Sequence, residues 1–146
     1  MPRILVVDDD TSVRMAIQTL LEHEGFDVAS ADSGQHGLDA LNATAFDVVI
    51  VDIFMPGMDG LETITAFHQR APSVPIIAMS GFLFRDAASP APDFLSMATK
   101  LGAAYSLHKP FRPRELLEAV TACLSGTIQT VGEKTARPPL PSRRVV

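Results

Sequence analysis

The sequence predicts a doubly wound α/β fold, in which helices cover both faces of a five-stranded parallel sheet. Short apolar runs alternate with stretches of helical periodicity five times along the chain, and consecutive βα units favour a parallel sheet. The first, third and fourth runs are nearly all apolar, which is typical of strands buried on both sides. Right-handed crossovers then place the carboxyl ends of all the strands at one edge of the sheet.

The expected strands follow from the apolar runs and from the turn residues that flank them. Their ranges are Arg3–Val7, Asp27–Ala31, Asp47–Val51, Val74–Met79 and Ala104–His108.

Five helices are expected between and after these strands, from apolar residues at helical spacing. The first has Thr11 or Ser12 as its candidate N-cap, and Gly25 is suited to end it. The last begins at Pro113, a residue suited to the first helical turn, and runs to about Ser125. The apolar positions of the three helices between them are Leu38 and Leu41, then Leu61, Ile64 and Phe67, then Phe94, Met97, Ala98 and Leu101 before Gly102.

Length and composition favour a single folded domain. The chain has 146 residues, of which 47% are hydrophobic, so one globular domain is expected over residues 1–125. Residues 126–146 contain three prolines and no apolar period, which predicts a flexible C-terminal tail. The long connection over residues 82–93 is interpreted as a surface insertion or a lid.

Charge and hydropathy exclude several functions. The net charge of −5 argues against a nucleic-acid-binding surface. No apolar run approaches the ~20 residues that span a bilayer, and no signal peptide is recognised, so no membrane association and a cytoplasmic location are expected. The single cysteine, Cys123, cannot form an internal disulfide or a cysteine metal cage and is interpreted as a buried or half-buried apolar residue.

Charged and hydroxyl residues follow the predicted strands at the edge where such folds bind ligands. Asp8 and Asp9 follow the first strand, Asp52 the third, Ser80 the fourth and Lys109 the fifth. Converging carboxylates repel one another unless a cation joins them, and oxygen ligands without nearby cysteine or histidine favour Mg²⁺ over zinc. Because Mg²⁺ takes one or two carboxylates together with phosphate oxygens, the pattern predicts a phosphoryl-transfer site.

Asp52 is the best candidate for a nucleophile that forms an acyl phosphate, because it stands alone at the end of a central strand. The metal and Lys109 would neutralise the phosphoryl oxygens. The Ser80 hydroxyl could donate a hydrogen bond to one of them, and Gly81 leaves room for the group. The Lys109–Pro110 bond is a candidate for a cis peptide that aims the lysine into the pocket.

Together, five segments of the chain resemble the receiver domain of two-component response regulators, the family of the single-domain chemotaxis regulator. The resemblance covers residues 3–125 and implies a flavodoxin-like fold with strand order 2-1-3-4-5. The segments are Val6-Val7-Asp8-Asp9, Asp52 with Met55-Pro56-Gly57-Met58-Asp59-Gly60, Ser80-Gly81, Gly102-Ala103 and Lys109-Pro110-Phe111.

The resemblance implies a role for each matching position. Asp52 is the implied phosphoacceptor, and Lys109 is the lysine that pairs with the phosphoryl group. Ser80 matches the hydroxyl switch residue of the family. The implied Mg²⁺ ligands are Asp8, Asp9, Asp52 and the backbone carbonyl of Phe54, with Asp9 the more direct ligand of the acidic pair.

Two features depart from the family pattern. The aromatic switch position, three residues before Lys109, holds Ser106, while the adjacent Tyr105 is expected to point to the opposite face of the strand. The connection after Ser80 is longer than is usual in the family, and it lies beside the surface that family members use for signalling.

The resemblance implies a stand-alone phosphorylation switch that is not an enzyme in the ordinary sense, because it catalyses only its own phosphorylation and dephosphorylation. The expected phosphodonor is a sensor histidine kinase or a histidine phosphotransfer protein. The output is expected to be phosphorylation-dependent binding of another protein, and homodimerisation is left open.

Two other functions remain open at this point. Asp8-x-Asp10 after an apolar strand also matches the signature of haloacid-dehalogenase-type phosphatases, with Asp8 as nucleophile and Asp10 as acid/base. Alternatively, the chain is a docking module of the same fold that is never phosphorylated.

Overall fold

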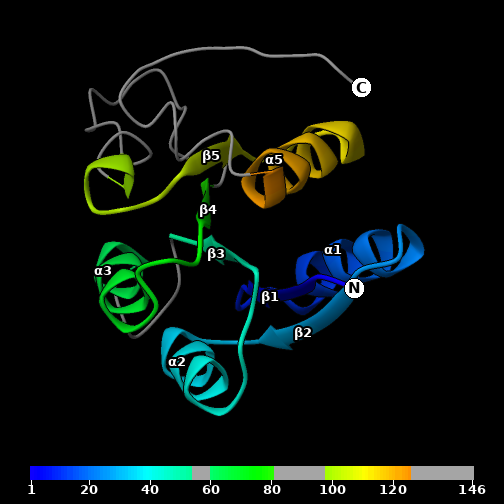
Figure 1. The fold of residues 1–146 in the computed structure, drawn as a ribbon. Helices are drawn as coiled ribbons and strands as arrows, with labels where there is room; N and C mark the ends of the chain where they lie inside the picture. The colour runs from blue at the N-terminus through cyan, green and yellow to red at the C-terminus, as the bar shows by residue number, and fades with distance from the viewer. Residues whose placement is uncertain (54–59, 81–97, 126–146) are drawn as a thin grey trace, which may run out of the picture.

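One parallel sheet organises the chain, and a computed structural model describes residues 1–53, 60–80 and 98–125 (Figure 1). The strands pair in the order β2-β1-β3-β4-β5, and every pairing is parallel. The predicted fold class and strand order are therefore confirmed. The strands are β1 (Arg3–Val7), β2 (Asp27–Ala31), β3 (Val48–Asp52), β4 (Ile76–Ser80) and β5 (Tyr105–His108).

Helices cover both faces of this sheet. Figure 1 shows α1 and α5 on one face and α2 and α3 on the other. Residues 98–100 are also helical, whereas most of the predicted fourth helix lies outside the described residues. The helices with full bounds are α1 (Thr11–His23), α2 (Gly34–Ala43), α3 (Gly60–Arg70) and α5 (Pro113–Ser125).

The core has two halves, one on each face of the sheet, because successive residues of a strand point to opposite faces. Leu5 and Val7 pack under α2 and α3, while Ile4 and Val6 pack under α1 and α5. Both faces are buried, which explains why the central strands are almost wholly apolar. Cys123 lies in the second half and is buried, as predicted, and burial raises the pKa of its thiol to about 12.

The predicted element boundaries differ from the structure at three places that bear on the site. Asp52 is the last residue of β3, paired with Met79 of β4, and Ser80 is the last residue of β4, whereas each of these two predicted strands ended one residue earlier. The N-cap of α1 is Asp10, not Thr11 or Ser12 as predicted. Asp10 has an extended backbone and accepts a hydrogen bond from the Val13 N–H at 3.2 Å, so the two residues after it are already helical.

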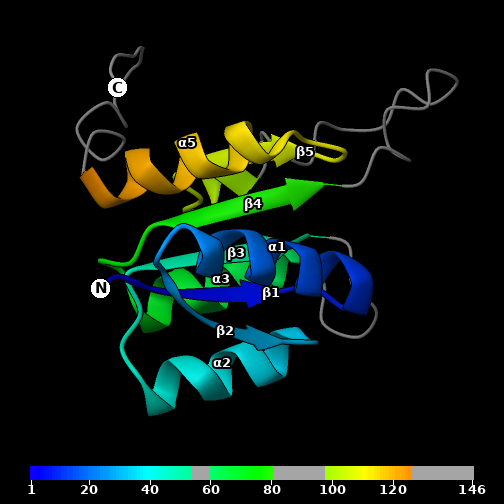
Figure 2. The ribbon, with the colours of Figure 1, turned by 90° about the vertical axis from the view of Figure 1, so that its right-hand side faces the viewer.

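The carboxyl ends of the strands meet at one edge of the sheet. In Figure 2, the arrows of β1, β2 and β4 run in the same direction, toward the edge opposite the N-terminus, and β3 and β5 pair in parallel with them. The residues that end or follow β1, β3, β4 and β5 are therefore placed together, as the crossover rule predicted.

Helices α2 and α3 lie side by side (Figure 1) and approach closely at a glycine. A Cβ atom added at Gly37 would lie 2.7 Å from Cζ of Phe67 and 3.0 Å from Cγ2 of Val7. Because Phe67 and Val7 are almost completely buried, neither can move away easily. Gly37 therefore makes room for the phenylalanine ring between α2 and the sheet.

We predict that Gly37→Ala destabilises the domain by about 1–3 kcal/mol through overpacking, measured by urea unfolding. The direction of this change in stability is informative, because replacing glycine by alanine in a helix interior ordinarily stabilises a protein by about 1 kcal/mol. In a Phe67→Leu background, Gly37→Ala should lower the free energy of unfolding by a smaller amount, because the nearest ring atom is gone. An equal cost in both backgrounds, or a gain in the wild-type background, would contradict this packing.

Candidate functional site

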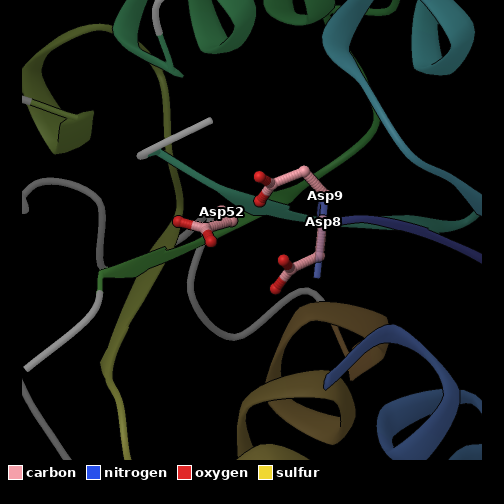
Figure 3. Close-up of side chains that lie close together, drawn as sticks. All are labelled: Asp8, Asp9 and Asp52. Atoms are coloured by element: carbon pink, nitrogen blue, oxygen red, sulfur yellow. The ribbon is translucent and has the colours of Figure 1, made fainter. Parts of the chain in front are cut away.

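Three carboxylates gather at the carboxyl edge of the sheet. Figure 3 shows Asp8 and Asp9, which follow β1, beside Asp52 at the end of β3. Each offers one oxygen atom, and these oxygens all lie within 4.8 Å of one another. Asp8 is fully buried, Asp52 is buried, and Asp9 is exposed to solvent. The structure thus brings together the acidic residues that the sequence singled out.

Lys109 connects two of these carboxylates. Its Nζ lies 2.8 Å from Oδ2 of Asp8 and 2.9 Å from Oδ2 of Asp52, and its side chain is only 17% exposed. Burial by itself would lower the pKa of Lys109, but the hydrogen bonds to the two aspartates and their negative charges outweigh it and raise the pKa. The ammonium group therefore stays charged inside the pocket at neutral pH.

The turn that carries Lys109 has the features expected from the sequence. The Lys109–Pro110 peptide bond is cis. The backbone N–H of Lys109 donates to the carbonyl oxygen of Ser80 at 2.7 Å, which ties the end of β5 to the end of β4. Ser80 is 3% exposed and is the last residue of its strand. It therefore lies at the same edge as the carboxylates.

Asp8 is held on several sides. Its backbone N–H donates a hydrogen bond to the Ala31 carbonyl at 3.1 Å. Its carboxylate accepts two hydrogen bonds, one at Oδ1 from the Asp10 N–H at 2.9 Å and one at Oδ2 from Nζ of Lys109. Its backbone carbonyl accepts Nη1 of Arg14 at 2.7 Å. Asp8 is thus a buried anchor, whereas the neighbouring Asp9 faces the solvent from which a cation would arrive.

Sequence reasoning did not find Arg14. An arginine in the first half of a predicted helix is ordinarily a solvated side chain. Its contact depends on the direction in which helical side chains point, back toward the helix N-terminus. The only available signal was its position six residues after Asp8, which no motif made conspicuous.

The aromatic switch position, Ser106, and its neighbour Tyr105 lie on β5. Tyr105 packs in the half of the core beneath α1 and α5, together with Leu107, and burial raises the pKa of its hydroxyl. Ser106 is half-buried and, by strand alternation, points to the opposite face. The predicted opposition of Tyr105 and Ser106 agrees with this arrangement.

Several predicted features lie outside the described residues. These are the Phe54 carbonyl and the turn that follows it, Gly81, the connection over residues 82–93, and the tail over residues 126–146. Their roles remain predictions.

The phosphatase alternative needs Asp10 as an acid/base beside Asp8. Asp10 instead uses its side chain to cap α1, and it is absent from the carboxylate cluster that the described residues form. Both carboxylate oxygens of Asp8 accept hydrogen bonds. This arrangement leaves Asp8 poorly placed as a nucleophile.

The donor set fits magnesium. The cluster consists of carboxylates alone, and no cysteine or histidine joins it among the described residues. Hard oxygen donors of this kind suit Mg²⁺. Because Lys109 balances only part of the negative charge of three aspartates, a divalent cation would complete the neutralisation.

Comparison with known proteins identifies the family. A family model described as the response regulator receiver domain matches residues 4–121. The chain is 37% identical over 120 residues to the DNA-binding transcriptional regulator NtrC of Klebsiella pneumoniae, covering 82% of this chain and 24% of NtrC. It is 34% identical over 126 residues to the transcriptional regulatory protein CpxR of Escherichia coli K12, covering 85% of this chain and 50% of CpxR.

Solved structures give the same result. A CheY-like response regulator receiver domain protein from Methanospirillum hungatei JF-1 superposes with a TM-score of 0.78 at 28% identity, covering 89% of this chain and 98% of that one. No described helix is long and apolar enough to cross a membrane. The chain spans half or less of the length of the two transcriptional regulators that it matches. It belongs to the response regulator receiver domain family, the phosphate-accepting domain of two-component signalling.

Proposed function

We propose that Asp52 accepts the phosphoryl group in a Mg²⁺-dependent reaction. The expected donor is a phosphohistidine of a sensor histidine kinase or a histidine phosphotransfer protein. One observation carries the proposal: Lys109 Nζ bridges Asp8 and Asp52 at 2.8 and 2.9 Å inside a cluster of three carboxylates. A cation already sits beside the candidate nucleophile, where it can neutralise an incoming phosphoryl group.

The transfer step needs little from the chain beyond placement. A carboxylate oxygen of Asp52 attacks the phosphorus atom, a new O–P bond forms, and the N–P bond of the donor breaks. The bonding electron pair returns to the imidazole nitrogen of the donor. Bound Mg²⁺ would supply charge neutralisation for the phosphoryl oxygens, held by Asp8, Asp9 and Asp52 and, by family resemblance, by the carbonyl of Phe54.

The remaining site residues act on the phosphoryl group after it arrives. Lys109 transfers one of its ammonium hydrogen bonds from a carboxylate to a phosphoryl oxygen. Ser80 ends β4 at the same edge, where its hydroxyl can donate to another oxygen and report the phosphorylated state. In self-catalysed dephosphorylation, water attacks the same phosphorus atom, the O–P bond to Asp52 breaks, and inorganic phosphate leaves while Asp52 returns to a carboxylate.

We propose that the output is phosphorylation-dependent binding of another protein. NtrC and CpxR are named as transcriptional regulators, whereas for this chain the net charge of −5 favours a protein partner over a nucleic acid. The boundary at residue 125, the stand-alone action and a homodimer stay predictions. Ser106 at the aromatic position implies that Ser80 acts without the usual aromatic partner.

Treatment with acetyl phosphate and Mg²⁺, followed by mass spectrometry, tests the phosphoacceptor. We expect one phosphoryl group on Asp52, no labelling of Asp52→Asn, and labelling to be lost when Mg²⁺ is removed with a chelator. Asp10→Asn serves as a matched control that leaves the carboxylate cluster intact. Labelling that persists in Asp52→Asn but disappears in Asp8→Asn would favour the phosphatase reading.

Replacing Lys109 tests the electrostatic account. Lys109→Met leaves two buried carboxylates without their ammonium, and removing one partner of a buried ion pair typically costs about 3–5 kcal/mol. We expect a loss of this order in the free energy of unfolding at neutral pH. The loss should shrink when Mg²⁺ is added, because the metal replaces the missing charge. Lys100→Met, at an exposed lysine, is the control and should change stability by less than about 0.5 kcal/mol.

The difference in stability between wild type and Lys109→Met should depend on pH in a definite direction. Because the pKa of Lys109 is raised in the folded state, its contribution is fully present below its unfolded pKa of about 10.4 and disappears as pH rises through the folded value. The stability gap between wild type and Lys109→Met should therefore be constant near neutrality and narrow only in the alkaline range. A gap that closes near neutral pH would mean that the ammonium is not the source of the effect.

A further inference from the structure

Arg14 contacts the site from outside the carboxylate cluster. It lies in the first half of α1 and is half-buried. Its Nη1 donates to the backbone carbonyl oxygen of Asp8 at 2.7 Å, and its Nη2 lies 3.5 Å from Oγ1 of Thr11. The main contact is thus with the backbone of a candidate metal ligand and not with a carboxylate.

The position of this contact in the chain gives it a specific consequence. The carbonyl of Asp8 belongs to the peptide unit that joins Asp8 to Asp9, and a peptide unit is planar. A hydrogen bond that fixes the Asp8 carbonyl therefore fixes the plane that carries the Cα of Asp9. Asp9 is exposed, so the orientation of its carboxylate depends strongly on its backbone.

Arg14 also lies near the negative charge of Asp32. Arg14 lines a surface hollow of about 320 Å³ together with Asp32 and His36. The hydrogen bond with His36 is the main cause that lowers the pKa of Asp32, and the positive charge of Arg14 adds to it. Asp32 is therefore ionised at neutral pH, and its charge attracts the guanidinium that donates to the Asp8 carbonyl.

We propose that Arg14 is a positioning residue for the magnesium site: by holding the peptide between Asp8 and Asp9, it sets the direction in which the Asp9 carboxylate meets the metal. The inference rests on the magnesium site proposed above. Groups that orient metal ligands by hydrogen bonding, without contacting the metal themselves, typically contribute 10–100-fold to metal affinity.

Simple electrostatics predicts the opposite sign, which makes the proposal testable. A guanidinium near a cation site repels the cation, so removing its charge should tighten Mg²⁺ binding if charge were its only effect. Removing a positioning residue should weaken binding. The direction of the change in Mg²⁺ affinity therefore separates the two roles.

The experiment is a Mg²⁺ titration of the full chain by isothermal titration calorimetry, with folding checked by circular dichroism. Arg14→Met removes the donors and the charge while keeping an apolar stem, and we expect the dissociation constant to rise about 10-fold or more. Arg14→Lys keeps a charged donor and should recover most of the affinity. Arg3→Met is the matched control. It removes the same charge from the amino end of the sheet, where Arg3 pairs with Asp27 at 2.9 Å, and should leave Mg²⁺ affinity unchanged.

The outcomes distinguish this inference from the proposed function. If wild type binds Mg²⁺ and Arg14→Met binds equally well or more tightly, the positioning role is overturned while the metal site stands. If wild type does not bind Mg²⁺, the proposed site fails and the inference fails with it. Arg14→Gln, a neutral polar substitution suited to a helix surface, takes the place of Arg14→Met if that variant does not fold, with the same expected loss.

Discussion

A largely buried ammonium group between two carboxylates determines how this domain is arranged at its functional edge. Lys109 reaches Asp8 across 101 positions of sequence and Asp52 across 57, so the ion pair depends on the ends of β1, β3 and β5 meeting at one place. Burying three such charges is costly unless they are paired. The parallel sheet supplies the geometry, and the pairing makes the charged edge compatible with an otherwise apolar core.

The three acidic residues differ in their exposure to solvent, and each is suited to a different role. Asp8 is completely buried and is held through its backbone and both carboxylate oxygens, so it is the fixed member. Asp9 is exposed and is the member that a hydrated cation would reach from solvent. Asp52 ends the central strand beside Lys109. This division would allow one cluster to bind a metal and also to present a nucleophile, the two roles proposed for it.

Much of this arrangement was predictable from the sequence, because strand ends follow from apolar runs and parallel strands end at one edge. Asp8, Asp9, Asp52 and Lys109 were found in this way, and the structure brings them together. The role of Arg14 was not predictable, because an arginine that donates to a backbone carbonyl leaves no pattern in the sequence.

Caps and close packing were also missed. Asp10 caps α1 where Thr11 or Ser12 was expected, because three candidate cap residues follow one another and only the backbone angles choose between them. The close packing of Phe67 against Gly37 was missed because it depends on the distance between α2 and α3. That distance cannot be derived from the sequence of either helix alone.

A crystal structure with Mn²⁺ in place of Mg²⁺ would test the central claim most directly, because manganese gives an anomalous signal that locates the ion. The account predicts an anomalous peak within coordination distance of the carboxylates of Asp9 and Asp52, with the ammonium of Lys109 directed into the same pocket. An ion bound elsewhere, or a Lys109 side chain that points into solvent, would contradict it.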